Sequence, residues 1–177
     1  MGGTGHDLLV GSAVGNVIDG GAGDDEIYGI GGGDILRGGA DQIFGFDGQD
    51  DLIGMQGNDT LVGGQGSDEL TGGGGSDRFV FNLASESTFT LRDTIKDFGV
   101  GGADVVDLSA IDANTGVSGN QIFNFVGSSA FANAGDLRFV TNGIDGYILG
   151  DVDGNGATDL NILLLGVTSM SASDFDL

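Results

Sequence analysis

Residues 54–80 read GMQGNDTLV GGQGSDELT GGGGSDRFV, three consecutive units of nine residues that share one pattern. Each unit has glycine at its first and fourth positions, aspartate at its sixth position and an apolar residue at its eighth position. A fixed short period in tandem units predicts a repeat architecture, in which each unit buries its apolar side chain against its neighbours.

The same register extends back to Gly2 and gives nine units that end at Val80. Eight units have nine residues, whereas the fifth, residues 38–44, lacks two, so we expect it to break or bulge the array. The sixth positions hold Asp7, Asn16, Asp25, Asp34, Asp41, Asp50, Asp59, Asp68 and Asp77. The eighth positions hold Leu9, Ile18, Ile27, Leu36, Ile43, Leu52, Leu61, Leu70 and Phe79.

The residue types of one unit indicate its local structure. The glycines allow a turn with positive φ, and the last three residues are extended, with the apolar eighth side chain pointing inward. Two units then form one coil of about 18 residues, so that each unit stacks on the next but one. One predicted ladder contains Asp7, Asp25, Asp41, Asp59 and Asp77, and the other contains Asn16, Asp34, Asp50 and Asp68.

Stacked carboxylates about 4.8 Å apart, the usual strand spacing, cannot all ionise without a cation between them. Ca²⁺ fits, because it takes six to eight oxygens from carboxylates and backbone carbonyls, whereas Mg²⁺ demands a stricter octahedron. Besides the aspartates, the predicted ligands include glycines of the turns: Gly20, Gly23, Gly32, Gly48, Gly57, Gly63, Gly66, Gly72 and Gly75. The alternative is that the aspartates only favour turns.

The units fit the consensus G-G-x-G-x-D-x-U-x, where U is apolar, and they resemble the calcium-binding repeats of RTX proteins. This resemblance implies an all-β fold, a right-handed parallel β-roll, over residues 1–80. It also implies that the parent protein is secreted and extracellular.

The composition agrees with a cation-dependent protein. The chain has 27 acidic and five basic residues, a formal net charge of −22, and no cysteine. A compact chain this acidic repels itself unless cations neutralise it. Nucleic acid and anionic membranes are poor partners because both need basic patches, and the sequence contains no stretch that could insert into a membrane. Disulfides and thiolate metal sites are excluded.

After Phe81 the glycine period stops, and short apolar or alternating runs follow. We expect strands within residues 78–82, 93–98, 104–111, 121–126, 136–140, 146–150 and 159–166, and no helix. Residues 81–177 are predicted to form a strand-rich, β-sandwich-like cap that is continuous with the roll, since a repeat array must cover its open end.

Strings in this second half carry a second resemblance. RDTIKDFGVGGADVVDLSAIDAN (92–114), AGDLRF (134–139), GDVDGNGATDLNILLLG (150–166) and ASDFDL (172–177) are similar to the C-terminal domain of serralysin-type secreted metalloproteases. The resemblance implies a domain that follows a catalytic domain, binds calcium and ends in an uncleaved signal for type I secretion. Asp174, Phe175 and Leu177 fit that signal, whereas Asp176 interrupts its apolar run.

Further acidic residues beyond the repeats are candidate calcium ligands: Asp97, Asp104 and Asp107. Asp151, Asp153 and Asn155, with Gly156, resemble the start of an EF-hand loop, and Asp159 follows them. Ile162 stands where an EF-hand has glutamate, so an acidic turn is the alternative to a calcium site there.

The sequence lacks the residues for the common hydrolytic sites. His6 is the only histidine, so no HExxH zinc site exists, and there is no GxSxG nucleophile motif. We therefore expect a non-enzymatic module whose partners are calcium ions, the type I secretion machinery and an N-terminal catalytic domain in a longer parent protein. The alternatives are a repeat module of an alginate epimerase or other polysaccharide-active enzyme that aids substrate binding, and an adhesin-type roll.

Overall fold

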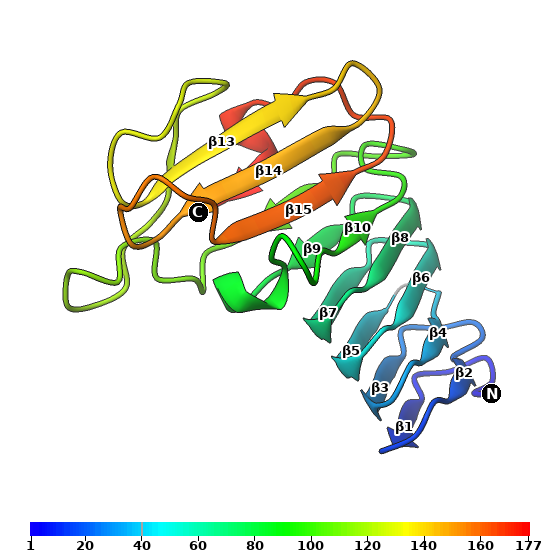
Figure 1. The fold of residues 1–177 in the computed structure, drawn as a ribbon. Helices are drawn as coiled ribbons and strands as arrows, with labels where there is room; N and C mark the ends of the chain where they lie inside the picture. Colours follow the sequence, from blue (N-terminus) through cyan, green and yellow to red (C-terminus); the bar gives the residue numbers. More distant parts are fainter. Residues whose placement is uncertain (40) are drawn as a thin grey trace.

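A computed structural model describes residues 1–39 and 41–177, so Ala40 of the short unit lies outside the described residues. The chain forms two sheets that run side by side along its length (Figure 1). In spatial order the first sheet contains β1 (Leu8–Ser12), β3 (Glu26–Gly31), β5 (Gln42–Gly48), β7 (Thr60–Gly66), β9 (Arg78–Val80), β11 (Val105–Asp107) and β16 (Phe175–Asp176). The second contains β12 (Asn124–Phe125), β13 (Asp136–Thr141), β14 (Gly146–Asp151), β15 (Leu160–Leu164), β10 (Thr94–Ile95), β8 (Glu69–Gly74), β6 (Asp51–Gln56), β4 (Ile35–Arg37) and β2 (Val17–Asp19).

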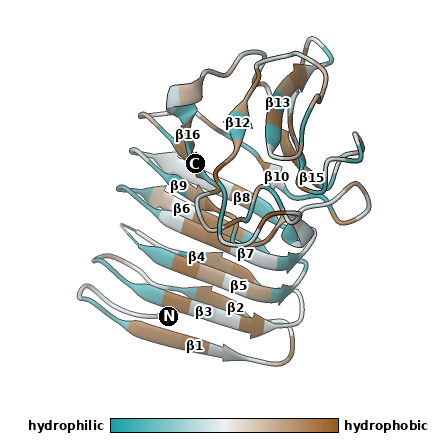
Figure 2. Ribbon diagram, turned by 90° about the vertical axis from the view of Figure 1, so that its left-hand side faces the viewer, coloured by the Kyte–Doolittle hydropathy of each residue, from teal (hydrophilic) through white to brown (hydrophobic). Residues whose placement is uncertain are grey.

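The repeats form the predicted all-β parallel roll. Strands of alternate units pair in parallel, with odd-numbered strands in one sheet and even-numbered strands in the other, which confirms that each unit stacks on the next but one. Figure 2 shows the apolar segments of successive strands stacked on one another. The pairing satisfies the backbone groups of each strand, and the pleat directs alternate side chains inward.

The short unit does not interrupt the roll, contrary to the sequence expectation. Strand β5 pairs with β3 from Glu26↔Gln42 and with β7 from Gln42↔Thr60, so both of its neighbours are in parallel register. The strand of the short unit is therefore intact and keeps the register of its neighbours. Pairing of Ile35 with Asp51 in the second sheet spans the same deletion.

The eighth-position side chains form the core of the roll. Seven of them, from Ile27 to Phe79, have no exposed surface, and burial of one such side chain stabilises a fold by about 1.5–3 kcal/mol. Leu9 is only partly buried, because its strand β1 lies at the edge of the first sheet and pairs with β3 on one side only.

Residues 81–177 extend both sheets. Strands β10 and β11 pair with the last repeat strands β8 and β9, and β13, β14 and β15 form an antiparallel meander that joins β10. The expected strands exist but several are shorter, since 104–111 contains only Val105–Asp107. Strand β16 was not expected and pairs with β11. The only helices among the described residues are two short 3-10 turns, η1 (Ala84–Glu86) and η2 (Ala172–Asp174).

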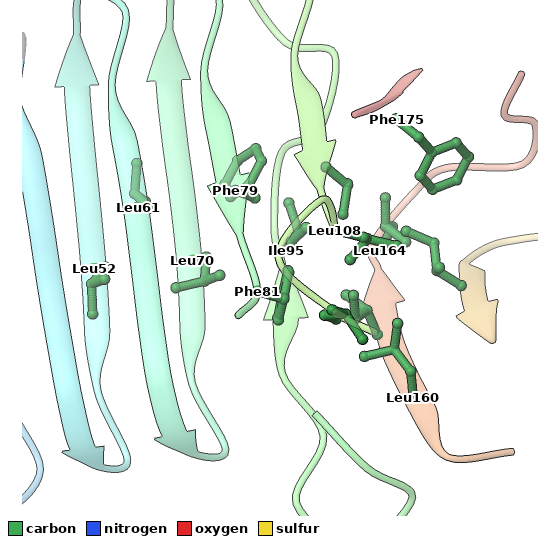
Figure 3. Packing of buried hydrophobic residues seen from close by; sticks show 14 of the residues in the cluster. Leu52, Leu61, Leu70, Phe79, Phe81, Ile95, Leu108, Leu160, Leu164 and Phe175 are labelled. Carbon is green, nitrogen blue, oxygen red and sulfur yellow. The ribbon is translucent and has the colours of Figure 1, made fainter. Parts of the chain in front are cut away.

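One core crosses the predicted boundary between residues 80 and 81. Phe79 and Phe81 are buried, and the cluster continues through Ile95 and Leu108 to Phe175 (Figure 3). The Phe79 and Phe98 rings lie 6.2 Å apart, which joins the last repeat to the cap directly. The part of the chain that the structure describes contains no helix with the length and apolar character needed to cross a membrane.

Candidate metal centre

The sixth-position side chains form two hydrogen-bonded ladders, one along each row of turns. In the first ladder the backbone N–H groups of Asp7, Asp25, Asp41 and Asp59 each donate to the Oδ1 atom of the next rung, over 2.5–2.9 Å. In the second ladder the N–H groups of Asn16, Asp34 and Asp50 do the same over 2.7–2.9 Å. Each carboxylate is thereby fixed over the turn of the preceding coil, which confirms the predicted order of both ladders.

The second oxygen of most rungs is buried and has no hydrogen-bond partner. This holds for the Oδ2 atoms of Asp25, Asp34, Asp50, Asp59, Asp68 and Asp77. Burying a carboxylate oxygen without a partner is strongly unfavourable, so the arrangement requires a cation or a proton. Asp41 differs, because Gly39 N–H donates to its Oδ2 atom, and Asp7 lies at the less buried end of its ladder.

First-position glycines are required because the free oxygen lies against them. A Cβ atom would lie 2.4 Å from Asp59 Oδ2 at Gly54, 2.5 Å from Asp68 Oδ2 at Gly63 and 2.2 Å from Asp77 Oδ2 at Gly72. A Cβ atom at Gly20 would likewise collide with Asp25 Oδ2. Of the predicted glycine ligands, Gly20, Gly63 and Gly72 belong to this class.

The remaining predicted glycines occupy the fourth position, where carbonyl groups stack. A Cβ atom at Gly66 would lie 1.6 Å from the Gly48 carbonyl oxygen, and one at Gly75 would lie 1.6 Å from that of Gly57. The φ angles of Gly48, Gly57, Gly66 and Gly75 lie between 126° and 159°, which side chains rarely adopt. Gly23 and Gly32 also have positive φ. The turns thus place columns of carbonyl oxygens along both edges of the roll.

Burial changes the electrostatics of the ladders. It raises the pKa of Asp50 to about 6 and the pKa values of Asp59 and Asp68 to about 7, although backbone hydrogen bonds act in the opposite direction. Burial also raises the pKa of Asp77, and the carboxylates of Asp104 and Asp97 add to the rise. Neighbouring carboxylates therefore repel one another across the rungs, as expected for a cation site without its cation.

The second ladder continues into the cap through residues that the sequence analysis missed. Asp68 N–H donates to Asp93 Oδ1 over 2.8 Å, and Asp93 Oδ2 is buried without a partner. Burial, together with the neighbouring carboxylates of Asp68 and Glu86, raises the pKa of Asp93 to about 8, although the hydrogen bond from Asp68 N–H lowers it. The signal was present, since Asp93-Thr94-Ile95 repeats the D-x-U spacing of the units although the glycines are absent.

The first ladder continues through two predicted residues. Asp77 N–H donates to Asp104 Oδ1 over 2.9 Å, and Gly99 N–H donates to Asp104 Oδ2 over 2.7 Å. Asp97 accepts from Gly72 N–H and Gly73 N–H, at the turn that carries Asp77. Asp104 and Asp97 therefore extend the ladder of Asp77 beyond the last repeat.

Asp107 belongs to neither hydrogen-bonded ladder. Its carboxylate accepts from Arg78 over 2.5 Å and from the Ser109 N–H and Oγ groups. Burial raises its pKa, but these hydrogen bonds and the Arg78 charge hold the pKa below its usual value. Arg78 also pairs with Asp176, so it links the last repeat to β11 and β16.

Asp151, Asp153 and Asp159 gather in the loop between β14 and β15, with one oxygen of each within 4.8 Å of the others. Most of their oxygens already accept hydrogen bonds. Gly154 N–H and Gly156 N–H donate to Asp151, Asn155 donates to both oxygens of Asp153, and Val152 N–H donates to Asp159 Oδ2. The sequence prediction that these residues come together is correct. The hydrogen bonds also fit the alternative of an acidic turn.

A parallel roll whose turns carry stacked carboxylates defines a repeat module that is compatible with calcium binding. Comparison with protein families identifies the family to which the chain belongs. The family Peptidase M10 serralysin C terminal matches residues 1–177, and the chain belongs to that family. The chain is accordingly a non-catalytic repeat module of a larger secreted protein, whose catalytic activity resides in other domains.

Solved structures agree with the fold. The R2 subunit of the mannuronan C5-epimerase from Azotobacter vinelandii is similar, with 26% sequence identity and a TM-score of 0.56, over 93% of this chain and 91% of that chain. The R3 subunit from the same organism's mannuronan C5-epimerase has 23% identity and a TM-score of 0.40, over 99% of this chain and 80% of that chain. The search of curated proteins gave no match.

Proposed function

We propose that this chain is a calcium-triggered folding and type I secretion module, which follows an N-terminal catalytic domain in an extracellular protein. The observation that carries the proposal is the set of buried Oδ2 atoms without partners in both ladders. A divalent cation between rungs would be coordinated by these oxygens together with carbonyl oxygens of the turns. The ligands would be the predicted aspartates and glycines of the repeats, with Asp93, Asp97 and Asp104 at the junction.

The charge of the chain explains why folding would depend on calcium. With a net charge of −22, the calcium-free chain repels itself and stays open at cytosolic calcium levels. An open chain fits a narrow export channel. Outside the cell, millimolar calcium binds only the folded form and stabilises it by mass action. Affinities of roughly 10⁻⁴–10⁻³ M, typical of extracellular modules, would place the switch between the two compartments.

A matched pair of adjacent residues tests the ladder ligands. In Asp25→Asn the Oδ1 acceptor remains but the free oxygen becomes an amide, whereas Asp24→Asn makes the same charge change at an exposed side chain. Calorimetric calcium titration should show a weaker or lost site for Asp25→Asn and an unchanged curve for Asp24→Asn. Equal curves for the two variants would contradict the proposed ligands.

The C-terminal residues are proposed to be the export address. In the folded chain Phe175 is 8% exposed, and its ring lies 5.0 Å from that of Phe125. Deletion of residues 172–177 should abolish export of a reporter fusion through a type I channel. Phe125→Ala weakens the same packing without changing the C-terminus, so it should reduce folded stability and leave export intact. Export that survives the deletion would refute the address.

Similarity to the R2 subunit favours a second candidate function, a module that aids polysaccharide binding. Alginate is a polyanion, and a chain with net charge −22 and five basic residues suits it poorly. Calorimetric titration of the calcium-loaded chain with mannuronan distinguishes the candidates. Measurable binding in calcium would favour the second function, and its absence would favour the first.

A further inference from the structure

The outer face of the first sheet carries a strip of apolar side chains where a solvated sheet face is normally polar. The strip consists of Val10, Tyr28, Ile30, Phe44, Phe46 and Val62, on β1, β3, β5 and β7. Tyr28 is in register with Phe44, and Ile30 with Phe46. The Phe44 ring lies 5.0 Å from that of Tyr28, and the Phe46 ring lies 5.9 Å from it.

Two residues of the strip hold an unfavourable backbone conformation. Ile30 and Phe46 have φ angles of 88° and 81°, in the left-handed region that favours glycine. Glycine occupies the same unit position at Gly21, Gly64 and Gly73, with φ angles of 98–103°. A β-branched or bulky side chain is strained there, and such strain concentrates at functional sites.

The strained side chains remain partly exposed, although the Phe46 ring contacts Tyr28. Ile30 is 40% exposed and Phe46 is 43% exposed. Glycine at either position would relieve the strain and remove apolar surface from water. On the first sheet these two side chains also adjoin the aromatic residues Tyr28 and Phe44, and contact of this combined surface with another molecule would account for them.

The strip is hollowed beside η1. A cavity of about 350 Å³ is lined by Tyr28, Phe44, Phe46, Val62, Gly64, Asn82 and Glu86. Its walls are apolar except for Asn82 and the Glu86 carboxylate at one end. Exposed Glu26, which accepts from the Tyr28 hydroxyl, and exposed Asp47 add negative charge around the strip. No lysine or arginine lines the hollow.

These features select the chemistry of the occupant. The Tyr28 and Phe44 planes are within 11° of parallel and the rings stack on each other, which leaves less open ring face for a sugar. A second copy of the chain would bring another charge of −22 to the same surface. We propose that the strip and its hollow form a docking surface for a polypeptide segment that combines apolar side chains with lysine or arginine, a partner beyond the proposed calcium function.

A synthetic peptide of alternating leucine and lysine provides the probe, since its extended form presents apolar side chains on one face and its charge complements the surface. Binding to the calcium-loaded full chain is measured by fluorescence anisotropy. We expect Phe46→Gly to weaken binding at least about tenfold, a change of about 1.4 kcal/mol. The variant should keep or raise thermal stability, because it relieves the φ strain, so lost binding cannot be ascribed to unfolding.

Met55→Gly is the matched control. Met55 has a φ of 81° and is 47% exposed, but it lies on β6 in the second sheet, away from the strip. It should leave peptide binding unchanged. The proposal is overturned if Phe46→Gly binds as the unchanged chain does, or if a serine–lysine peptide binds equally well. It is likewise overturned if sedimentation shows a dimer that depends on Phe46, or if a neutral oligosaccharide occupies the strip.

Discussion

The aspartate of each unit and its first-position glycine act as a pair. The carboxylate folds back over the turn, and the space that a Cβ atom would fill at Gly63 contains Asp68 Oδ2. The N–H of Asp50 fixes the other oxygen, Oδ1, over 2.9 Å. The backbone and the side chain would therefore shape the calcium site together, because the turn leaves no room beside the free oxygen for a residue larger than glycine.

Gly63→Ala tests this pairing. Its Cβ atom would lie 2.5 Å from Asp68 Oδ2, so the carboxylate or the turn must move. We expect the calcium midpoint of folding to rise and the calcium-bound form to lose about 1–3 kcal/mol of stability. Gly5→Ala is the control, since a Cβ atom there has no neighbour within 4 Å. Circular dichroism during calcium titration measures both, and equal midpoints would contradict the pairing.

The raised aspartate pKa values predict how pH acts on the calcium-free chain. Burial raises the pKa of Asp59 and Asp68 to about 7 and that of Asp93 to about 8, whereas an aspartate in the unfolded chain has a pKa of about 3.9. The folded chain then binds protons more tightly than the unfolded chain. The stability that these groups contribute is fully present below about pH 4 and is lost as pH rises through about 7 to 8.

In chelator, the β signal in circular dichroism should therefore be larger at about pH 5 than at about pH 8. The apparent calcium affinity should rise over the same interval, because protons stop competing for the carboxylates. Asp24→Asn, at an exposed side chain, should preserve both trends. A β signal in chelator that stays constant or increases towards alkaline pH would show that the buried carboxylates do not control folding.

At the scale of the elements, the ladders continue beyond the last glycine turn, because an aspartate still precedes each of the next two strands. Strands β10 and β11 lack the glycine turns of the units, yet Asp93 and Asp104 precede them as the sixth-position aspartates precede the repeat strands. Asp93 is fully buried beside Ser87, whose Oγ accepts from the Asp93 N–H. The junction thus extends both ladders by one rung.

Asp93→Asn should have opposite effects in the two states. In chelator at about pH 5 it removes the cost of burying and protonating a carboxylate near Asp68 and Glu86, so chemical unfolding should show a more stable chain. With calcium it removes a proposed ligand, so the stabilisation that calcium adds should shrink. Chemical unfolding with and without calcium measures both signs. A variant that is destabilised equally in both conditions would indicate a purely structural role for Asp93.

The sequence predicted the repeat elements closely and the cap less well, for physical reasons. Period nine sets the register of Ile27, Leu52 and Leu61 without reference to the rest of the chain. Strand β16 has only two residues, and its position depends on Arg78 and on the core around Phe175, which are far away in sequence. The same holds for Glu86, which tertiary packing alone brings near Asp68.

At the scale of the whole molecule, one apolar core and two carboxylate ladders run through the same roll and into the cap. The core favours compaction, whereas a net charge of −22 opposes it. Cations bound along both edges would neutralise the charge repulsion, and the stabilisation from the buried apolar core would remain. The cap and the roll should then fold together, since Phe79, Ile95 and Leu108 belong to one cluster.

Calcium titration of the full chain, followed by circular dichroism after removal of divalent ions, tests this account most directly. We predict a chain with little β structure in chelator, a cooperative gain of β signal with calcium at roughly 10⁻⁴–10⁻³ M, and no comparable gain with magnesium. Reversal by chelator should restore the open state. The same β content in chelator and in millimolar calcium at neutral pH would contradict the account.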